Sequence, residues 1–254
     1  MSAVLLERED GLSIVTLNRP QSYNAMNEVM LSQLLETVKQ LEGNDDRIVI
    51  ICGAGDAFSA GGDVQMMAEE RTNEEMAETM DLINELVLRL YKLNKIVISA
   101  IHGSAAGLGL SLALNSDITL AHKDAKIGML FAGVGFVPDG GGHFFLEKRI
   151  GAHRAKQFIW SMQQIDGKHG QAFGLIDEIT EADVVETAKQ YGKKLLQLPF
   201  EASIATKHIY NEQDEQKLRA ILAAEKVAQI ELSQTANHKE GVQAFLEKRI
   251  PRFE

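Results

Sequence analysis

The sequence has little of what marks secreted, membrane or nucleic-acid-binding proteins. Its 254 residues include one cysteine, Cys52, so no disulfide can form within the chain. No apolar run approaches the roughly 20 residues that span a bilayer, and the first ten residues lack the pattern of a signal peptide. The formal net charge of −10 disfavours nucleic acid or an anionic membrane as a partner. We therefore expect a cytoplasmic globular protein that binds neither.

Several motifs of known chemistry are also missing. The seven histidines show no H-x-x-x-H or H-E-x-x-H spacing, so we expect no metal site. The Ser nucleophile elbow G-x-S-x-G is absent, which disfavours α/β-hydrolase chemistry. Neither the P-loop nor the dinucleotide fingerprint G-x-G-x-x-G is present, so we expect no bound nucleotide cofactor.

The first part of the chain alternates strand-like and helix-like segments, which predicts an α/β core. Asp10-Gly11 separates two strand-like runs and predicts a hairpin turn. The apolar run 48–52 and the segment "KIVISAIHG" predict buried strands, and Cys52 within the first is expected to be buried. Helical spacing follows in 27–43, in 76–90 and from about 107.

After about residue 181 the strand signal stops and the pattern is helical. The expected helices cover 184–198, 202–210, 218–232 and 241–246. The hexapeptide "FLEKRI" occurs at 145–150 and at 245–250 without matching flanks, so it is not a structural repeat. We expect each copy to end an amphipathic helix, with its basic residues near the negative end of the helix dipole.

Two glycine-rich loops each follow a predicted buried strand. They are "CGAGDAFSAGGD" at 52–63 and "HGSAAGLGL" at 102–110. Small residues permit close approach of a ligand and leave backbone N–H groups exposed. Two N–H groups that converge on one point would stabilise an oxyanion, although either loop alone is more often a tight turn.

A third glycine run, "GVGFVPDGGGHFF" at 133–145, places Asp139 between a proline and three glycines. From the residues alone, Asp139 could be a helix cap, a metal ligand or a catalytic base. As a cap it would contribute about 1 kcal/mol and have no chemistry. As a base it needs an apolar setting, which Phe131 and Phe136 could supply by raising its pKa.

Five segments, in order, resemble the motifs of the enoyl-CoA hydratase/isomerase (crotonase) family. They are "LNRPQSYNAMN" (17–27), "FSAGGD" (58–63), "IHGSAAGLGLSLALNSD" (101–117), "GVGFVPDGGGHFFLEKRIG" (133–151) and "EGVQAFLEKRIPRF" (240–253). Each motif is weak alone, but five in register over nearly the whole chain are a strong resemblance.

The resemblance implies an α/β fold, a spiral of ββα units with a helical C-terminal region for oligomerisation. It predicts a spiral core with the acyl-CoA site in residues 1–195, a trimerisation region in 196–254, and a homotrimer or a dimer of trimers. The substrate would be an acyl-CoA thioester, with no cofactor beyond the CoA of that substrate. Two backbone N–H groups would hold the thioester oxygen, and the resemblance assigns them to Ala60 and Leu108. Leu108 departs from the family's glycine at that position.

Family hydratases use two glutamates, and the corresponding residues here are Ser111 and Phe131. Neither transfers protons as a carboxylate does. Asp139 occupies the position of the base in the family's Δ3,Δ2-enoyl-CoA isomerases and ring-opened phenylacetyl-CoA isomerases. The resemblance therefore implies an isomerase that shifts a double bond through an enolate, with Asp139 as acid and base.

Further residues are expected along the substrate path. The predicted substrate-binding set is Ser22, Tyr23, Ala60, Gly61, Gly62, Asp63, Gly107, Leu108, Ser111, Phe131 and Phe136. Arg19 and Lys248 are candidate cations for the CoA. His143 and Glu147 are expected at the surface or in packing. The alternatives are hydration or another reaction of the family, and a catalytically silent acyl-CoA-binding scaffold.

Overall fold

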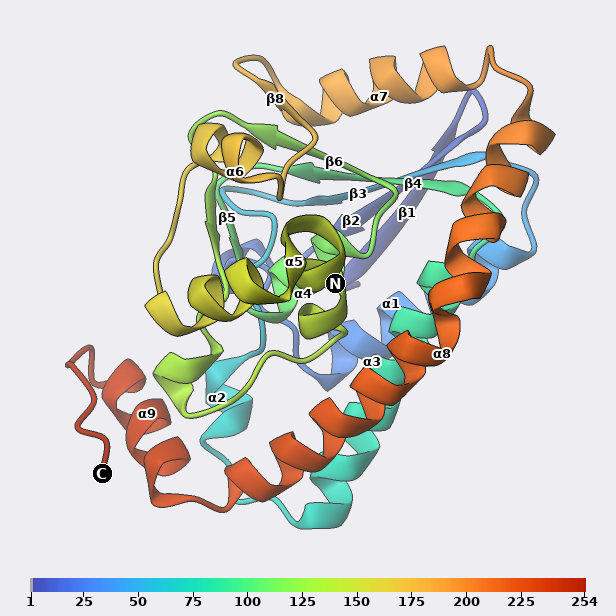
Figure 1. The fold of residues 1–254 in the computed structure, drawn as a ribbon. Helices are drawn as coiled ribbons and strands as arrows, with labels where there is room; N and C mark the ends of the chain where they lie inside the picture. Colours follow the sequence, from blue (N-terminus) through green and yellow to red (C-terminus); the bar gives the residue numbers. More distant parts are fainter. Residues whose placement is uncertain (1) are drawn as a thin grey trace.

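A computed structural model describes residues 2–254 and shows an α/β fold built on one twisted sheet with helices on both faces (Figure 1). The strands are β1 (Val4–Glu9), β2 (Leu12–Leu17), β3 (Ile48–Gly53), β4 (Ile96–Ile101), β5 (Ser104–Ala106), β6 (Ile118–His122), β7 (Lys126–Gly128) and β8 (Glu178–Thr180). The α-helices are α1 (Glu28–Glu42), α2 (Val64–Met67), α3 (Asn73–Lys92), α4 (Leu108–Leu114), α5 (Gly142–Ser161), α6 (Gly167–Phe173), α7 (Val184–Leu195), α8 (Phe200–Ser233) and α9 (Ala236–Leu246). Two 3-10 turns are η1 (Pro20–Ser22) and η2 (Phe131–Val134).

The main sheet has the strand order β1-β2-β3-β4-β6-β8, and β5 pairs with β7 in a second sheet. β1 and β2 form the antiparallel hairpin predicted at Asp10-Gly11, and the remaining pairs are parallel. The carboxyl ends of the parallel strands therefore meet at one edge, which is where ligands bind in open α/β sheets. The glycine-rich loops after β3 and after β4 both start at that edge.

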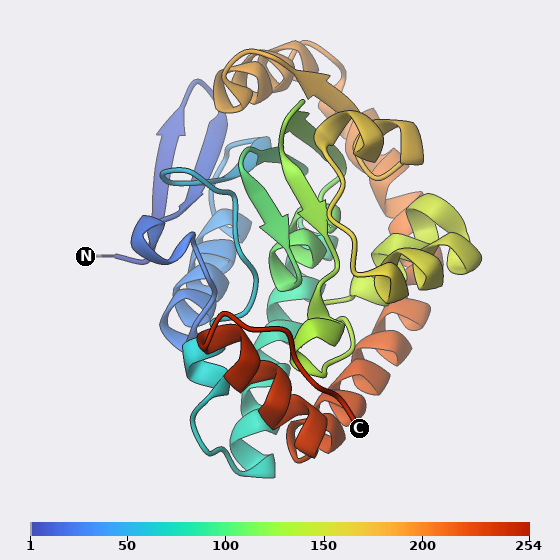
Figure 2. The same cartoon turned by 90° about the vertical axis from the view of Figure 1, so that its left-hand side faces the viewer.

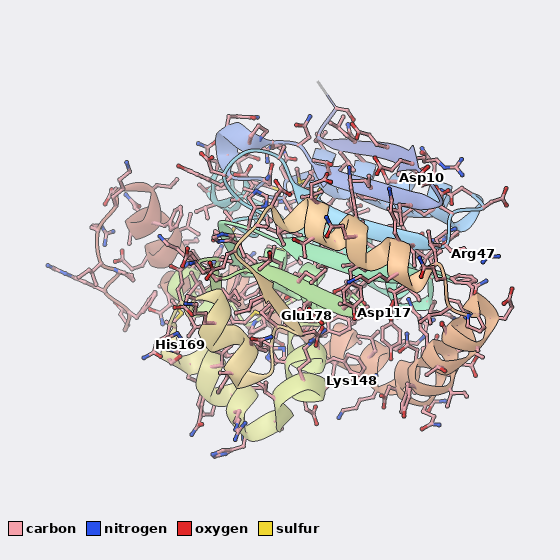
Figure 3. All side chains as sticks on the ribbon, turned by 90° about the horizontal axis from the view of Figure 1, so that it is seen from above. Asp10, Arg47, Asp117, Lys148, His169 and Glu178 are labelled. Carbon is pink, nitrogen blue, oxygen red and sulfur yellow. The ribbon has the colours of Figure 1, made fainter. Side chains whose placement is uncertain are left out.

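Both faces of the sheet are buried, which explains the continuous apolar strands in the sequence. In β3, Ile48, Ile50 and Cys52 belong to the core beneath α7, whereas Val49 and Ile51 belong to the larger core on the opposite face. Seen from above, α7 covers the sheet and runs roughly along its strands, with the labelled Asp10 near it (Figure 3). Lys193 Nζ donates to the Asp10 carboxylate at 3.0 Å and so ties α7 to the β1–β2 turn.

The C-terminal region contains one long helix where the sequence predicted two. α8 runs for 34 residues along α3 and then leads into α9 (Figure 1). The polar stretch 211–217 breaks the apolar period but contains no glycine or proline to stop a helix. Its side chains bond instead to neighbours: Asn211 donates to Tyr91 O at 2.9 Å, and Asp214 pairs with Lys148 at 2.9 Å.

The two copies of "FLEKRI" lie where helical geometry ends. The first copy is followed by Gly151, whose φ of 76° interrupts α5, and the second begins one residue before α9 ends. Leu218 and Leu222 of α8 belong to the same core as the sheet. A domain boundary at residue 195 and the trimer stay predictions. Within residues 2–254, no helix combines the length and apolar character needed to cross a membrane.

Gly103, at the turn between β4 and β5, lies against the other glycine-rich loop, so replacing it by alanine tests whether the two loops must stay in contact. Its φ is +55°, and a Cβ there would lie 1.8 Å from Asp56 O. Gly151 has a similar φ of +76° but nothing within 4 Å of an added Cβ. With a ψ of 152° its backbone lies in a region adopted almost only by glycine, so we expect Gly151→Ala to cost about 1–3 kcal/mol from backbone strain alone. Gly103→Ala should cost more than about 3 kcal/mol because backbone atoms must also move.

Urea denaturation of the two variants measures both values. Equal destabilisation of Gly103→Ala and Gly151→Ala would show that the loops can separate without penalty, contrary to this expectation.

Candidate active site

A cavity of about 760 Å³ opens between α2, α3, η2, the end of α8 and α9. Figure 2 shows α9 lying against α2 at this side of the molecule. Its buried wall is mainly apolar and includes Met26, Leu31, Met76, Met80, Ile83, Leu108, Phe131 and Phe136. Its charged wall residues, apart from Asp139, lie in the segment 69–71 and on and just after α9. The cavity has the size and the mostly apolar lining of a small-molecule site.

The first glycine-rich loop is held by the segment that carries the N-R-P motif. Asn24, completely buried, donates to Ala54 O at 2.8 Å and to Ala57 O at 2.7 Å. Ser59 Oγ donates to Asn24 O at 2.8 Å and accepts the Gly61 N–H at 3.1 Å. These bonds explain why the motif needs an amide side chain at position 24, where the buried carbonyls require donors.

The same loop also pairs with the segment that follows β4. Ser59 N–H donates to Ser104 O at 2.9 Å, and Ala106 N–H donates to Ser59 O at 3.0 Å. A Cβ added to Gly61 would lie 2.7 Å from Ala106 O and 3.4 Å from Leu108 N. The two loops therefore approach to backbone contact, as their glycines predicted.

The structure corrects one of the two predicted oxyanion donors. Ala60 is exposed, and its N–H donates to Tyr23 O at 2.9 Å, so this group is already used. Gly62, two residues later, lies in the cavity wall together with Leu108. Within residues 2–254, neither Gly62 N–H nor Leu108 N–H has a hydrogen-bond acceptor. Gly62 and Leu108 therefore form the candidate pair of oxyanion donors at the cavity, in place of Ala60 and Leu108.

Asp139 lies in the cavity wall and is 8% exposed. Its Oδ2 accepts a hydrogen bond from Gln229 Nε2 at 2.8 Å, and its buried Oδ1 has no partner among the described residues. It does not cap α5, whose N-cap residue is Gly141. The N–H groups of Gly141 and His143 donate instead to the Glu225 carboxylate, at 2.8 and 3.1 Å. The cap interpretation of Asp139 is therefore wrong.

The surroundings of Asp139 favour its neutral form. Burial, and then the negative charge of Glu225, raise the pKa of Asp139 to about 7, while the hydrogen bond from Gln229 acts in the opposite direction. No lysine or arginine in residues 2–254 forms a salt bridge with it. A carboxyl group with a pKa near neutrality can both accept and donate a proton at physiological pH.

The two positions that carry glutamates in hydratases supply no carboxylate here. Phe131 is in the cavity wall. Ser111 is completely buried and does not line the cavity. Its Oγ has no hydrogen-bond partner in the described chain, and a Cβ added to Gly142 would lie 2.8 Å from that oxygen. The described cavity wall contains four acidic residues, and Asp139 is the only buried one. Glu69, Glu70 and Glu247 are exposed.

Other predicted residues lie outside the cavity wall. They are Ser22, Tyr23, Ala60, Gly61, Asp63 and Gly107. Asp63 caps α2 through Gln65 N–H at 3.1 Å and pairs with Arg19 at 2.8 Å, so Arg19 serves this loop. Lys248 follows α9 and is exposed; its contact with CoA stays a prediction.

Three residues of the cavity region were not expected from the sequence: Glu225, Gln229 and His238. Glu225 and Gln229 continue the spacing of Leu218 and Leu222 on α8, so they occupy core positions of the helix. Polar residues in a buried stripe were the signal that could have found them.

His238, on α9, fixes η2 from the other side of the cavity. Its ring stacks on Phe136 with centroids 3.9 Å apart, and its Nδ1 lies 2.7 Å from Val134 O. Burial lowers the pKa of His238, which favours the neutral ring.

The chain is similar to known proteins over nearly its whole length. A family model described as enoyl-CoA hydratase/isomerase matches residues 7–254. The chain is 44% identical over 240 residues to a putative enoyl-CoA hydratase/isomerase, YhaR, of Bacillus subtilis, covering 94% of each chain. It is 34% identical to a 1,2-epoxyphenylacetyl-CoA isomerase of Escherichia coli, covering 100% of this chain and 98% of that one. A crystal structure of an enoyl-CoA hydratase from Mycobacterium avium subsp. paratuberculosis superposes with a TM-score of 0.90 at 27% identity, covering 99% and 98%.

The buried Asp139 predicts a pH-dependent stability. Its pKa in the folded protein, about 7, lies above the ordinary value of 3.8, so folding favours the protonated form. The protonated carboxyl group therefore adds to the free energy of unfolding in full below about pH 3.8. This stabilisation is lost as the pH rises through about 7, at about 1.4 kcal/mol per pH unit. Asp139→Asn removes the titration. The difference in free energy of unfolding between the variant and the original protein should therefore shift in favour of the variant by roughly 3 kcal/mol from about pH 5 to about pH 8.

Urea denaturation at both pH values measures this gain. Asp56→Asn, at an exposed carboxylate without a side-chain hydrogen bond in the described structure, is the matched control. If the stability difference between Asp139→Asn and the original protein does not change with pH, Asp139 has the usual pKa of an aspartate in the folded protein, contrary to this expectation.

Proposed function

The chain belongs to the enoyl-CoA hydratase/isomerase family, and from this premise we propose that it shifts the double bond of an enoyl-CoA thioester. The observation that carries the proposal is the single buried carboxylate, Asp139, in a cavity wall that also contains two free backbone N–H groups. One carboxylate and two N–H donors are the minimum for moving a proton beside a thioester.

In the proposed reaction, ionised Asp139 takes a proton from C2 of a 3-enoyl-CoA. The electron pair of that C–H bond moves into the conjugated system and places negative charge on the thioester oxygen. The N–H groups of Gly62 and Leu108 stabilise this dienolate, and loss of one such donor typically costs about 100- to 1,000-fold in rate. Protonated Asp139 then returns the proton to C4, which leaves a 2-enoyl-CoA. The reaction needs no cofactor beyond the CoA of the substrate.

Hydration is less well supported by the same wall. Adding water across a double bond requires one group to activate the water and another to donate a proton. Phe131 occupies one of the two hydratase positions, and Ser111 is buried outside the wall. Asp139 would have to act alone in both roles while Phe131 excludes water from the neighbouring position.

The buried wall supports an apolar acyl group as the substrate's reacting part. Met26, Met76 and Met80 contribute flexible, polarisable side chains that adapt to the shape of a ligand. The described wall contains two basic side chains, Arg71 and Lys239. The Arg71 guanidinium already bonds to Glu28 and Thr79, and Lys239 is exposed on α9. A carboxylate that ends among the buried wall residues would therefore have no cation partner, because Lys239 belongs to the exposed part of the wall.

Asp139→Asn tests the proposed base. An asparagine cannot take up the C2 proton, so kcat for a 3-enoyl-CoA should fall by about a thousand-fold or more. Conjugation of the product with the thioester gives an ultraviolet absorbance that follows the reaction. Binding of the unreactive saturated acyl-CoA, measured by calorimetry, should stay within about threefold because the carboxamide keeps the shape of the site.

Turnover that is unchanged in this variant would contradict the base assignment. Loss of the absorbance of a 2-enoyl-CoA without isomerisation of the 3-enoyl-CoA would favour a hydratase. Binding by the original protein without turnover of any thioester would favour the scaffold.

The acyl preference can be tested with two 3-enoyl-CoA substrates of equal chain length, one ending in a methyl group and one in a carboxylate. Burying an unpaired carboxylate costs several kcal/mol, so kcat/KM should be at least about 100-fold lower for the acidic substrate. Equal values of kcat/KM would show that the wall supplies a cation or water to the end of the chain.

A further inference from the structure

The buried face of α8 places two polar residues, one helical turn apart, beside Asp139. We propose that Glu225 and Gln229 act as an opposed pair of positioning residues that set when Asp139 can exchange a proton: Glu225 opposes the negative charge of Asp139, and Gln229 supports it. This inference rests on the proposed function, in which Asp139 is the base.

Gln229 holds one oxygen of the carboxylate. The side chain is 1% exposed, and its Nε2 donates to Asp139 Oδ2 at 2.8 Å and to Val137 O at 3.1 Å. The amide is therefore anchored to the backbone just before Asp139 as well as to its side chain. A hydrogen bond to the ionised form of a carboxylate stabilises that form. The second oxygen, Oδ1, keeps no protein partner within the described residues.

Glu225 is held at the start of α5, the helix that begins three residues after Asp139. It is 3% exposed and accepts the N–H groups of Gly141 and His143, and it also lies 2.8 Å from His143 Nδ1. The positive end of the α5 dipole and the two N–H donors stabilise a negative charge at this position. That charge repels a second negative charge on Asp139 and so favours its protonated form.

Several other charged groups lie around the site. On α5, His143 faces Glu225 and is partly exposed. The segment between α2 and α3, together with α9 and the residue after it, contributes the wall residues Glu69, Glu70, Arg71, His238, Lys239 and Glu247. Glu225 is not one of these wall residues, yet after burial its charge is what raises the pKa of Asp139. Gln229 is the only side chain in the described structure that bonds to Asp139.

A purely structural role does not explain both residues. Leucines at positions 218 and 222 fill the same stripe of α8 with apolar contacts, and such contacts would also suffice to pack positions 225 and 229. Burying a carboxylate and an amide is costly unless they do something that an apolar side chain cannot. Burial raises the protonation midpoint of Asp139 most, and two residues that act on the same carboxylate in opposite directions can then adjust that midpoint close to neutral pH.

Two variants test this inference through the pH dependence of the full-length protein. Glu225→Gln removes the charge and keeps one oxygen, which can accept one of the two N–H groups at the start of α5. Gln229→Met keeps the length of the side chain but removes the donor. The acid limb of kcat/KM reports the ionisation of the base in the free enzyme and should have its midpoint near pH 7 in the original protein. The midpoint should move down by about one pH unit in Glu225→Gln and up by about one in Gln229→Met.

Infrared difference spectra of the carboxyl group, referenced to Asp139→Asn, measure the same midpoint without turnover. Glu231→Gln, at an exposed position on α8 outside the cavity wall, is the matched control and should leave the limb unchanged. Melting temperatures identify any variant that fails to fold. If Glu225→Gln does not fold, the upward shift in Gln229→Met decides the question.

Midpoints that move in the same direction, or that do not move in folded variants, would overturn the inference and leave α8 with a packing role. Opposite infrared shifts support it even if no variant isomerises a 3-enoyl-CoA. In that case the proposed isomerase function fails, while the control of Asp139 by α8 stands. The two proposals can therefore fail separately.

Discussion

The backbone pairing between Ser59 and the segment after β4 is the contact on which the candidate site depends. It continues the parallel alignment of β3 and β4 beyond the ends of both strands. This pairing brings the loop that carries Gly62 against the turn that carries Leu108. Because the donors are backbone N–H groups, the side chains at both positions can vary while the donors remain. The added side chain of Leu108 therefore changes the shape of the cavity without removing its chemistry.

Much of the fold could be predicted from the sequence because its strands are apolar on both faces and its loops are marked by glycines. The hairpin at Asp10-Gly11, the strand β3 and the helical C-terminal region all followed from local pattern. The length of α8 did not, because its polar middle section interrupts the apolar period although nothing in it stops a helix. There, side chains such as Asn211 bond to elements that are distant in the sequence, and local periodicity does not report such partners.

The candidate site was predictable where a motif names a side chain and less so where the function belongs to the backbone. Asp139 could be singled out from its glycine run, but its environment could not. Gln229 bonds to Asp139 from 90 positions away along the chain, and Glu225 accepts the nearby Gly141 N–H from 84 positions away. Likewise, a motif cannot tell which N–H group of the first loop is free. The N–H of Ala60 is used by Tyr23 O, a contact that depends on how two loops fold together.

The C-terminal helices complete the candidate site. α8 supplies the side chains that contact Asp139 and the start of α5, and α9 closes the cavity through His238 and Val242. A buried carboxyl group without a cation is unfavourable for stability at neutral pH, and the fold tolerates it because the surrounding core is large. If α8 were displaced, Asp139 would gain water and lose both neighbours, so its pKa would return toward the ordinary range of a carboxylate. Docking of α8 and the basicity of Asp139 are therefore linked, which ties the chemistry proposed for residue 139 to the region predicted to assemble the oligomer.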